Sequence, residues 1–389
     1  MSLSIREMSL CKFCSLREGL RASSSKVCAL CNGLFDQIDK ISKDVTEKLQ
    51  EYQFESFLIG TTMPSEVIDN EDELRARLRI RGKESIKSQF NTILTQKITS
   101  LTKKTVNYSM PDVTVLISLT TGSISITSRS VWLSARYKKQ KRGVAQRSST
   151  CQVCNGLGCV ECSYKGRSGK SVETLSSSLF SEKFKGESCN FVWLGSEDEN
   201  SLVEGTGRPF YVEVVQPRKR FAGLTVPNKR RLELASDGIE ISKIHRLEKK
   251  FSDVPMFDIS CRVFLKSETG STNPELQVKE IENNFSNCRV GVRLNRKYRI
   301  VRRFIRSIKA KTHADGSAEL MIECEGGIPI KKLVTGQDNT VEPNLSSLIK
   351  FYRIDPDQPF DILDVKLRKP GARVSDGLEN SSSLATELS

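Results

Sequence analysis

Two adjacent carboxylates precede a glycine-rich segment that carries an arginine. Residues 193–198 read Trp-Leu-Gly-Ser-Glu-Asp, residues 205–209 read Gly-Thr-Gly-Arg-Pro, and an alternating strand pattern follows at 211–215. The glycines permit tight bends and a close approach of the backbone to a ligand. The guanidinium of Arg208 can bind a phosphate or a carboxylate through two parallel hydrogen bonds. The pattern therefore predicts a reactive carboxylate on a turn beside an anion-binding loop.

The chain is strongly basic, because 61 lysines and arginines against 47 aspartates and glutamates give a formal net charge of +14. This excess favours a polyanion as partner, and the clustering of the basic residues points to a nucleic acid. A membrane surface is not expected as a partner, since no amphipathic apolar face accompanies the clusters. The residues that we expect to contact the nucleic acid are Lys138, Lys139, Arg142, Arg208, Arg218, Lys219, Arg302 and Arg303.

Composition and motifs exclude several kinds of chemistry. With only two histidines, His245 and His313, a histidine triad or a histidine-rich metal site is nearly excluded. Residues 166–171 look like part of a phosphate loop, but Tyr164 stands where such a loop requires glycine. Because no Gly-x-Gly-x-x-Gly lies between a strand and a helix, we expect no nucleotide or other organic cofactor.

Eight of the twelve cysteines form two groups of paired Cys-x-x-Cys motifs, which predict structural zinc. The pairs are separated by thirteen residues in the first group and by four, two of them glycine, in the second. A redox dithiol or chance pairing is the alternative for the first group, and the pairs of the second could combine with distant thiols instead. The expected ligands are Cys11, Cys14, Cys28 and Cys31, and Cys151, Cys154, Cys159 and Cys162.

The sequence indicates a soluble protein of two or three domains, since it has 389 residues and no run of ~18 apolar ones. The N-terminus lacks the apolar core of a signal peptide, so we expect a cytoplasmic location. Nothing in the sequence indicates whether the chain is a monomer. Apolar spacing predicts helices at 36–57 and 71–101, with a break at Gly82, then strands at 112–119 and 124–133 and a basic linker at 135–146.

The second half of the chain mixes strand and helix patterns, and a mixed or antiparallel sheet flanked by helices is the simplest arrangement of them. The polar, serine-rich residues 371–389 are expected to be disordered. Strands are expected at 210–215, 258–265, 302–310 and 318–324, and helices at 274–285 and 344–351.

The segment from 193 to 210 resembles the catalytic segment of the archaeal and eukaryotic tRNA pseudouridine synthases of the family numbered ten. That segment reads roughly Gly-Arg-Glu-Asp, a spacer, then Gly-Thr-Gly-Arg-Pro-Phe. In this family a THUMP-containing RNA-binding region ends in an Arg-Tyr-Lys, Arg-Gly, Gln run directly before a Cys-x-x-Cys element, as at 136–146 and 151–162 here. The resemblance covers most of residues 1–370.

The resemblance implies an α+β protein of four parts, with an active cleft across the middle of a mixed or antiparallel sheet that helices flank. The parts are a four-cysteine zinc module at 1–35, a THUMP-like RNA-binding domain with its basic linker at 36–148, a pseudouridine synthase catalytic domain that includes the second cysteine group at 149–370, and the disordered tail at 371–389.

The resemblance also implies roles for individual residues. Asp198 falls on the family's catalytic aspartate and would attack either the sugar C1′ or the base C6. In the motif at 328–333, Lys331 would hold the charge of the aspartate and Leu333 would pack under the base, whereas a solvated lysine pair is the alternative. Arg208 would bind an RNA phosphate or brace the catalytic loop.

Several positions depart from the family pattern. Ser196 stands where the family usually has an arginine that helps to displace the flipped base, and Pro329 stands where it usually has a tyrosine. The strand at 259–265 offers only Cys261 or Phe264 where the family has its active-site tyrosine.

The expected function is the isomerisation of uridine to pseudouridine in the T-loop of tRNA, at positions 54, 55 or both in tRNA numbering. A non-catalytic tRNA-binding protein on the same scaffold is the alternative, favoured by Ser196 and by the missing tyrosine. Another THUMP enzyme, such as a methyltransferase or thiolase, is disfavoured because the sequence lacks a cofactor loop.

Overall fold

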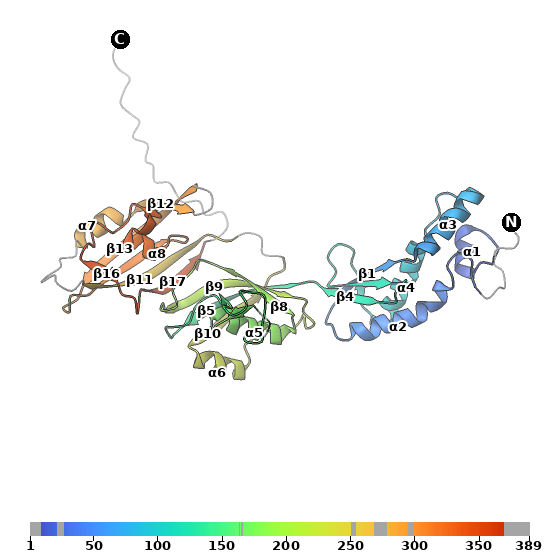
Figure 1. Ribbon diagram of the computed structural model, residues 1–389, viewed down its shortest axis with the longest axis horizontal. Helices are drawn as coiled ribbons and strands as arrows, with labels where there is room; N and C mark the ends of the chain where they lie inside the picture. The colour runs from blue at the N-terminus through green and yellow to red at the C-terminus, as the bar shows by residue number, and fades with distance from the viewer. Residues whose placement is uncertain are drawn as a thin grey trace, which may run out of the picture.

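The computed structural model describes residues 9–21, 27–162, 164, 166–249, 254–267, 278–294 and 299–368. These residues form a smaller and a larger lobe that lie next to one another along the long axis of the molecule (Figure 1). The smaller lobe extends to Ser128, and the larger begins at Val131. The tail at 371–389, predicted to be disordered, lies outside the described residues.

The smaller lobe packs helices against a sheet whose strands lie in the order β2-β1-β3-β4. Strand β1 pairs in parallel with β2 and with β3, and β4 is antiparallel to β3. Its elements are α1 (Lys12–Glu18), the 3-10 turn η2 (Leu34–Gln37), α2 (Ile38–Leu49), β1 (Ser56–Thr62), α3 (Ser65–Leu78), α4 (Ile86–Thr102), β2 (Thr105–Val106), β3 (Val113–Ser118) and β4 (Ile124–Ser128).

Two helix predictions for this lobe need correction. The helix predicted at 36–57 ends at Leu49, and residues 56–62 form β1, whose side chains alternate between buried and half-buried as a two-residue period requires. The helix predicted at 71–101 is two helices, because α3 ends at Arg79 in the left-handed conformation. The break predicted at Gly82 is therefore confirmed, although α3 begins earlier than expected.

The larger lobe is built on an eleven-stranded sheet of the described residues, with the strand order β10-β5-β9-β17-β11-β14-β13-β12-β15; β8 pairs with β9, and β16 with β11. Its strands are β5 (Val131–Lys139), β8 (Ser188–Trp193), β9 (Val203–Val215), β10 (Ile239–Arg246), β11 (Phe257–Ser267), β12 (Cys288–Leu294), β13 (Arg299–Thr312), β14 (Ala318–Glu325), β15 (Val341–Glu342), β16 (Tyr352–Ile354) and β17 (Phe360–Leu367).

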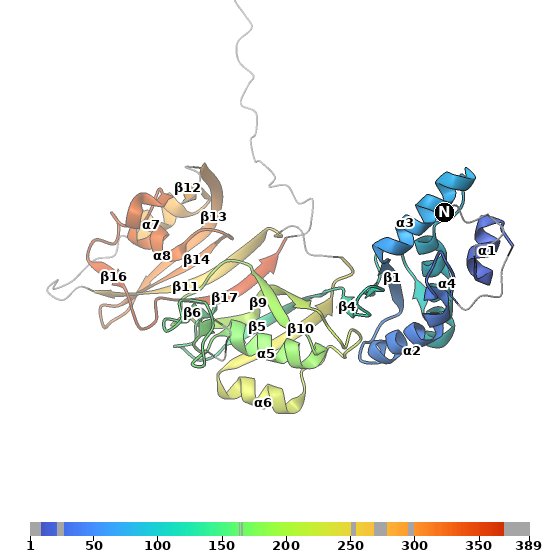
Figure 2. The same ribbon diagram turned by 45° about the vertical axis from the view of Figure 1, so that its right-hand side comes forward.

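Helices flank both halves of this sheet (Figure 2), which confirms the predicted fold class. Helices α5 and α6 lie on the half formed by β5, β8, β9 and β10, while α7 and α8 lie on the other half. The halves meet where β9 runs parallel to β17, with Val203 opposite Ile362. The bounds are α5 (Val172–Phe184), α6 (Asn228–Ser236), α7 (Val278–Phe285) and α8 (Ile330–Thr335), and the ribbon of β6 (Ser149–Thr150) and β7 (Arg167–Ser168) borders the second cysteine group.

Three further expectations differ from the structure. The first residues of the supposed linker at 135–146 belong to β5, which pairs with β9 and β10 in the large sheet. The Gly-Thr-Gly-Arg-Pro segment is part of strand β9 rather than a loop. Residues 344–351 form turns instead of a helix, in which Leu348 donates its N–H to the carbonyl oxygen of Leu345 at 2.9 Å and Tyr352 donates its N–H to that of Ile349 at 2.8 Å. Of the helix predicted at 274–285, residues 278–285 form α7, and 274–277 lie outside the described residues.

A loop of the larger lobe, residues 216–221, attaches the two lobes to one another. Ser128 donates its N–H to Oε1 of Gln216 at 2.6 Å, and Gln53 donates its N–H to the carbonyl oxygen of Arg218 at 2.7 Å. These hydrogen bonds connect the backbone of the smaller lobe, at Gln53 and Ser128, to this loop of the larger lobe. They therefore hold the two lobes in a fixed arrangement.

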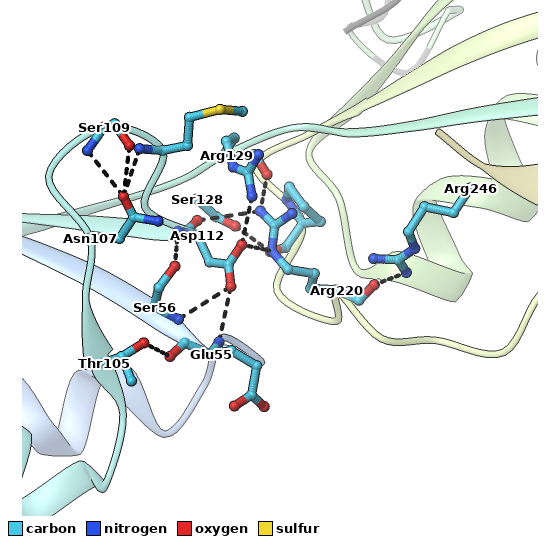
Figure 3. A network of polar contacts seen from close by, with 12 residues as sticks. Glu55, Ser56, Thr105, Asn107, Ser109, Asp112, Ser128, Arg129, Arg220 and Arg246 are labelled. Atoms are coloured by element: carbon cyan, nitrogen blue, oxygen red, sulfur yellow. Dashed lines mark hydrogen bonds and ion pairs between the residues drawn. The ribbon is translucent and has the colours of Figure 1, made fainter. Parts of the chain in front are cut away.

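A charged network lies at the same junction (Figure 3). Asp112, from the smaller lobe, contacts a guanidinium nitrogen of Arg129 at 2.8 Å and Nε of Arg220 at 3.5 Å. Arg220 also donates to the backbone carbonyl oxygens of Asp112 and Arg129, and Arg246 donates to that of Arg220. Residues of both lobes therefore share one polar cluster.

Candidate active site

Asp198 and Lys331, which are far apart in the sequence, form an ion pair across the middle of the large sheet. Lys331, on α8, donates from Nζ to Oδ2 of Asp198 at 2.5 Å. The side chain of Lys331 is 47% exposed and that of Asp198 is 25% exposed, so the pair is open to a ligand on one side. The backbone N–H of Asn200 donates to Oδ1 of Asp198 at 3.0 Å and fixes the rotation of the carboxylate.

The surroundings of Asp198 favour its ionised form. Partial burial acts to raise the pKa of the carboxyl group, but the hydrogen bonds from Lys331 and Asn200 and the charge of Lys139 outweigh it. The net result is a pKa below the ordinary value for aspartate. A carboxylate held in this state can act as a nucleophile near neutral pH without a separate base.

A pocket of about 310 Å³ opens beside this pair. Its volume lies at the lower end of the range for small-molecule sites, which suits a single flat ring. Asp198, Arg208 and Lys331 supply charged groups to its wall. The apolar wall consists of Phe257, Ile259, Ile328, Pro329, Ile330 and Phe360.

Behind the pocket lies a cluster of charged side chains that are almost fully buried. The Glu197 carboxylate contacts Nζ of Lys139 at 3.3 Å and a guanidinium nitrogen of Arg208 at 3.2 Å. Tyr137 donates its hydroxyl to the same carboxylate at 2.8 Å, and Gln146 donates to the tyrosine oxygen at 3.0 Å. Burial and the charge of Glu197 raise the pKa of Tyr137 well above its ordinary value, so its hydroxyl stays protonated.

Lys139 connects this cluster to the catalytic segment. Its Nζ donates to the carbonyl oxygens of Val144, Asp198 and Glu199 at 2.8, 2.9 and 3.1 Å. Burial lowers the pKa of Lys139, while the charge of Glu197 opposes that change. The lysine therefore fastens the backbone of Asp198 to strand β5, which explains how the short turn before β9 keeps its shape.

The structure corrects the predicted RNA-binding roles of two residues. Arg208 and Lys139 are buried, with exposures of 1% and 0%, so neither side chain is available to an RNA phosphate. Arg208 also donates from Nε to the carbonyl oxygen of Leu194 at 2.9 Å. This contact is the bracing role that the sequence left open as the alternative for Arg208.

The other predicted RNA-binding residues are placed differently. Arg142 directs its guanidinium to Asp361 through contacts of 2.7 and 2.8 Å. Arg218 is exposed and contacts Glu51 at 2.6 Å. Lys219 and Arg302 are exposed, and Lys138 and Arg303 are half-buried.

The pocket also contains residues that the sequence did not single out. Leu333 is fully buried and does not line the pocket, which disagrees with its predicted place under the base, whereas Ile328 and Ile330 do line the pocket. Phe257 and Phe360 are the aromatic rings in the pocket, whereas Cys261 is buried and Phe264 lies elsewhere. An alternating strand pattern shows which residues share a face, but it does not show which of them reaches a pocket.

The eight predicted metal ligands form two groups, each with all ligand sulfurs within 4.8 Å of one another, and each could hold a metal ion. In the second group, the N–H of Gly158 donates to Sγ of Cys154 at 3.1 Å. The N–H groups of Cys159 and Gly166 each donate to Sγ of Cys162 at 3.2 Å. N–H groups directed at sulfur stabilise thiolates, which are the form that binds metal.

An ionised aspartate held by a lysine, beside an apolar pocket at the centre of a mixed sheet, agrees with the class of enzyme that the sequence resembles, the pseudouridine synthases. Residues 132–366 match the family model described as "Pus10, C-terminal", and residues 41–118 match the model described as "Pus10 THUMP domain, archaeal". The chain belongs to the Pus10 family of tRNA pseudouridine synthases.

Curated relatives support this membership. The chain is 30% identical to the tRNA pseudouridine synthase Pus10 of Nitrosopumilus maritimus over 84% of this chain and 83% of that protein. It is 30% identical to the enzyme of the same name from Methanocaldococcus jannaschii, over 83% of this chain and 72% of that one. The corresponding Archaeoglobus fulgidus protein is 29% identical over 88% of this chain and 96% of its own length.

None of the helices in the described part of the chain is both long and apolar enough to cross a membrane.

Proposed function

We propose that this chain converts uridine to pseudouridine in the T-loop of tRNA, at position 54, 55 or both, with Asp198 as the nucleophile. The observation that carries the proposal is the contact of 2.5 Å between Lys331 and Asp198 at the edge of an apolar pocket. The T-loop as the site of modification is inferred from the family resemblance, and the names of the relatives support tRNA as the substrate.

The reaction breaks the bond between uracil N1 and ribose, turns the base, and joins it again through C5. Asp198 would attack the sugar C1′ or the base C6, and Lys331 would stabilise its charge before and after the attack. The apolar wall of Phe257 and Ile328 would hold the detached ring and exclude water. Because the lining contains no tyrosine among the described residues, removal of the C5 proton would use another group or water.

We propose that each cysteine group holds a structural zinc ion. A tetrahedron of sulfurs at about 2.3 Å from zinc has edges of about 3.8 Å. The distance from Cys11 Sγ to Cys31 Sγ is 3.8 Å. In the second group, three pairs of sulfurs are 3.9, 3.8 and 3.8 Å apart. The ligand sets therefore fit zinc, which would stabilise the two short segments that carry the cysteines.

The remaining basic residues would hold the tRNA backbone, and the protein would act in the cytoplasm. Lys138, Lys219, Arg302 and Arg303 keep their predicted role in RNA binding, and Arg218 would add to it from the junction. We also propose that the two domains meet at residues 129–130, where the chain passes from β4 to β5.

The proposal is tested by mapping pseudouridine on an unmodified tRNA transcript after incubation with the protein and with Asp198→Ala. We expect new pseudouridine in the T-loop from the unaltered protein alone, and equal tRNA binding by both. Asp338→Ala is a suitable control, because this aspartate also contacts a lysine, Lys332, at 3.1 Å but lies beyond the end of α8, in the 3-10 turn Gln337–Asn339, and does not line the pocket. Tight tRNA binding without pseudouridine from the unaltered protein would favour the non-catalytic alternative.

A further inference from the structure

A second pocket, of about 460 Å³, opens at the junction of the two lobes, away from the active site. Its wall contains residues of both lobes and of the loop that joins them. Leu133, opposite Arg246 in the sheet register, lies six positions before Lys139 along β5. At ~3.4 Å per residue, the pocket is therefore ~20 Å from the active-site cluster.

The wall of this pocket is rich in cations. Arg129, Arg220, Arg246 and Lys249 line it, together with the acidic residues Asp112, Glu213 and Glu248. Its aromatic residues are Trp132 and Phe221.

Asp112 cannot neutralise all of these cations, because its oxygens already have partners. Oδ2 accepts the backbone N–H groups of Glu55 and Ser56 at 3.0 and 3.3 Å, and Oδ1 contacts Arg129 and Arg220.

Arg246 has no carboxylate partner within salt-bridge distance among the described residues. Glu213 accepts a hydrogen bond from Asn190 at 3.1 Å, and Glu248 is exposed to solvent. The guanidinium of Arg246 lies over the ring of Phe221, 5.8 Å from its centroid, and donates to the backbone of Arg220. A half-buried cation without a counter-ion is costly, and a bound anion removes that cost.

Arg220 adds an unsatisfied donor at this pocket. Its side chain is 6% exposed, and its Nε has no hydrogen-bond partner, since the Asp112 oxygen at 3.5 Å is too distant. Burial lowers the pKa of Arg220 to about 10 and also lowers that of Arg246. Both pKa values are lowered because the nearby carboxylate of Asp112 does not fully offset the burial of the two guanidinium groups.

We infer that this junction pocket binds a backbone phosphate of the substrate RNA through Arg246, beside the unsatisfied Nε donor of Arg220. The inference rests on the proposed function, since it requires RNA as the substrate. An RNA that reaches from the smaller lobe to Asp198 has to cross the junction. A phosphate held there would fix the distance between the part of the RNA that the smaller lobe binds and the target base.

The test compares Arg246→Met with Arg246→Lys, each in the Asp198→Ala protein so that turnover does not change the RNA. Methionine keeps an apolar stem over Phe221, and lysine keeps the charge. Binding of an unmodified tRNA transcript is measured between ~50 and ~200 mM salt. Each lost phosphate contact should lower the slope of log affinity against log salt by ~0.7–0.9, so the advantage of the parent over Arg246→Met should shrink ~2.6-fold to ~3.5-fold across this range. Arg246→Lys should keep the parent slope.

Arg230→Met is the matched control, because this arginine is already neutralised by Glu182 and Glu233. We expect the slope for Arg230→Met to equal that of the parent. Equal slopes for all variants, or a slope for Arg246→Lys as low as for Arg246→Met, would overturn the inference. Thermal unfolding in inorganic phosphate distinguishes a site for free phosphate from a site for RNA. If phosphate raises the Tm of the parent but not of Arg246→Met, and the salt slope of tRNA binding is the same for both, the inference is also overturned. A parent that binds no tRNA would instead contradict the proposed function.

Discussion

The buried cluster behind the active site predicts a large effect for the substitution Glu197→Gln. Glu197 is the carboxylate that faces both Lys139 and Arg208, at 3.3 and 3.2 Å, and all three side chains are at most 2% exposed. The amide keeps the shape and can still accept the Tyr137 hydroxyl, but it removes the negative charge. Two cations would then remain buried without their shared counter-ion.

Breaking a buried ion pair in this way costs about 3–5 kcal/mol. In a lobe of this size, 1 kcal/mol corresponds to roughly 2–4 °C in Tm, so the expected decrease in Tm is at least about 6 °C. The free energy of unfolding is measured by urea denaturation at pH 7, with Glu199→Gln as the control. That neighbouring carboxylate is exposed and lies outside the buried cluster, so the control should change stability by less than about 0.5 kcal/mol.

The pH dependence of this loss provides a second check. Burial lowers the pKa of Lys139 in the folded protein from its ordinary value of 10.5. In Glu197→Gln the lysine loses the attraction of the acid, so its folded pKa falls further. Above that pKa the folded state holds a neutral lysine while the unfolded state still binds the proton, so stability rises with pH. The deficit of the variant should therefore shrink from pH 7 towards pH 10. A deficit below about 1 kcal/mol at pH 7, or one that grows with pH, would refute this account of the cluster.

Three other predictions follow from the same contacts. Lys331→Met should lower the single-turnover rate by about 100-fold and add an acidic limb to the pH–rate profile, because burial then raises the pKa of Asp198; an unchanged profile would contradict the pairing. Gly205→Ala should lower the urea midpoint by an amount worth more than about 1 kcal/mol, since φ is +54° and a Cβ would overlap the Leu363 carbonyl oxygen, whereas Gly223→Ala, in open space, should have no such effect. Cys154→Ser should remove one of two metal ions per chain by native mass spectrometry, and full retention would exclude this cysteine as a ligand.

The sequence predicted the pairing of Asp198 with Lys331 because both residues lie in recognisable motifs, and the structure brings the two side chains into contact. It also predicted both cysteine groups and most strands, because period-two alternation and cysteine spacing are local signals. It did not predict that Lys139 is a buried anchor, since a lysine within a basic run has the same local pattern whether it faces solvent or a carboxylate 58 positions further on. The burial of Arg208 and the position of Phe257 likewise depend on how distant strands pair.

The direct passage from β4 to β5 has a practical consequence for dividing the protein. Strand β5 lies between β9 and β10 and supplies Tyr137 and Lys139 to the centre of the molecule. A fragment that starts at the boundary of 148 expected from the sequence would begin after β5, the first strand of the larger lobe. It would therefore lack an interior strand of the sheet and Lys139, which holds the backbone of Asp198. Expression of the catalytic half alone should therefore begin near residue 130, and a deletion that reaches a few residues further would inactivate the enzyme without touching a reacting group.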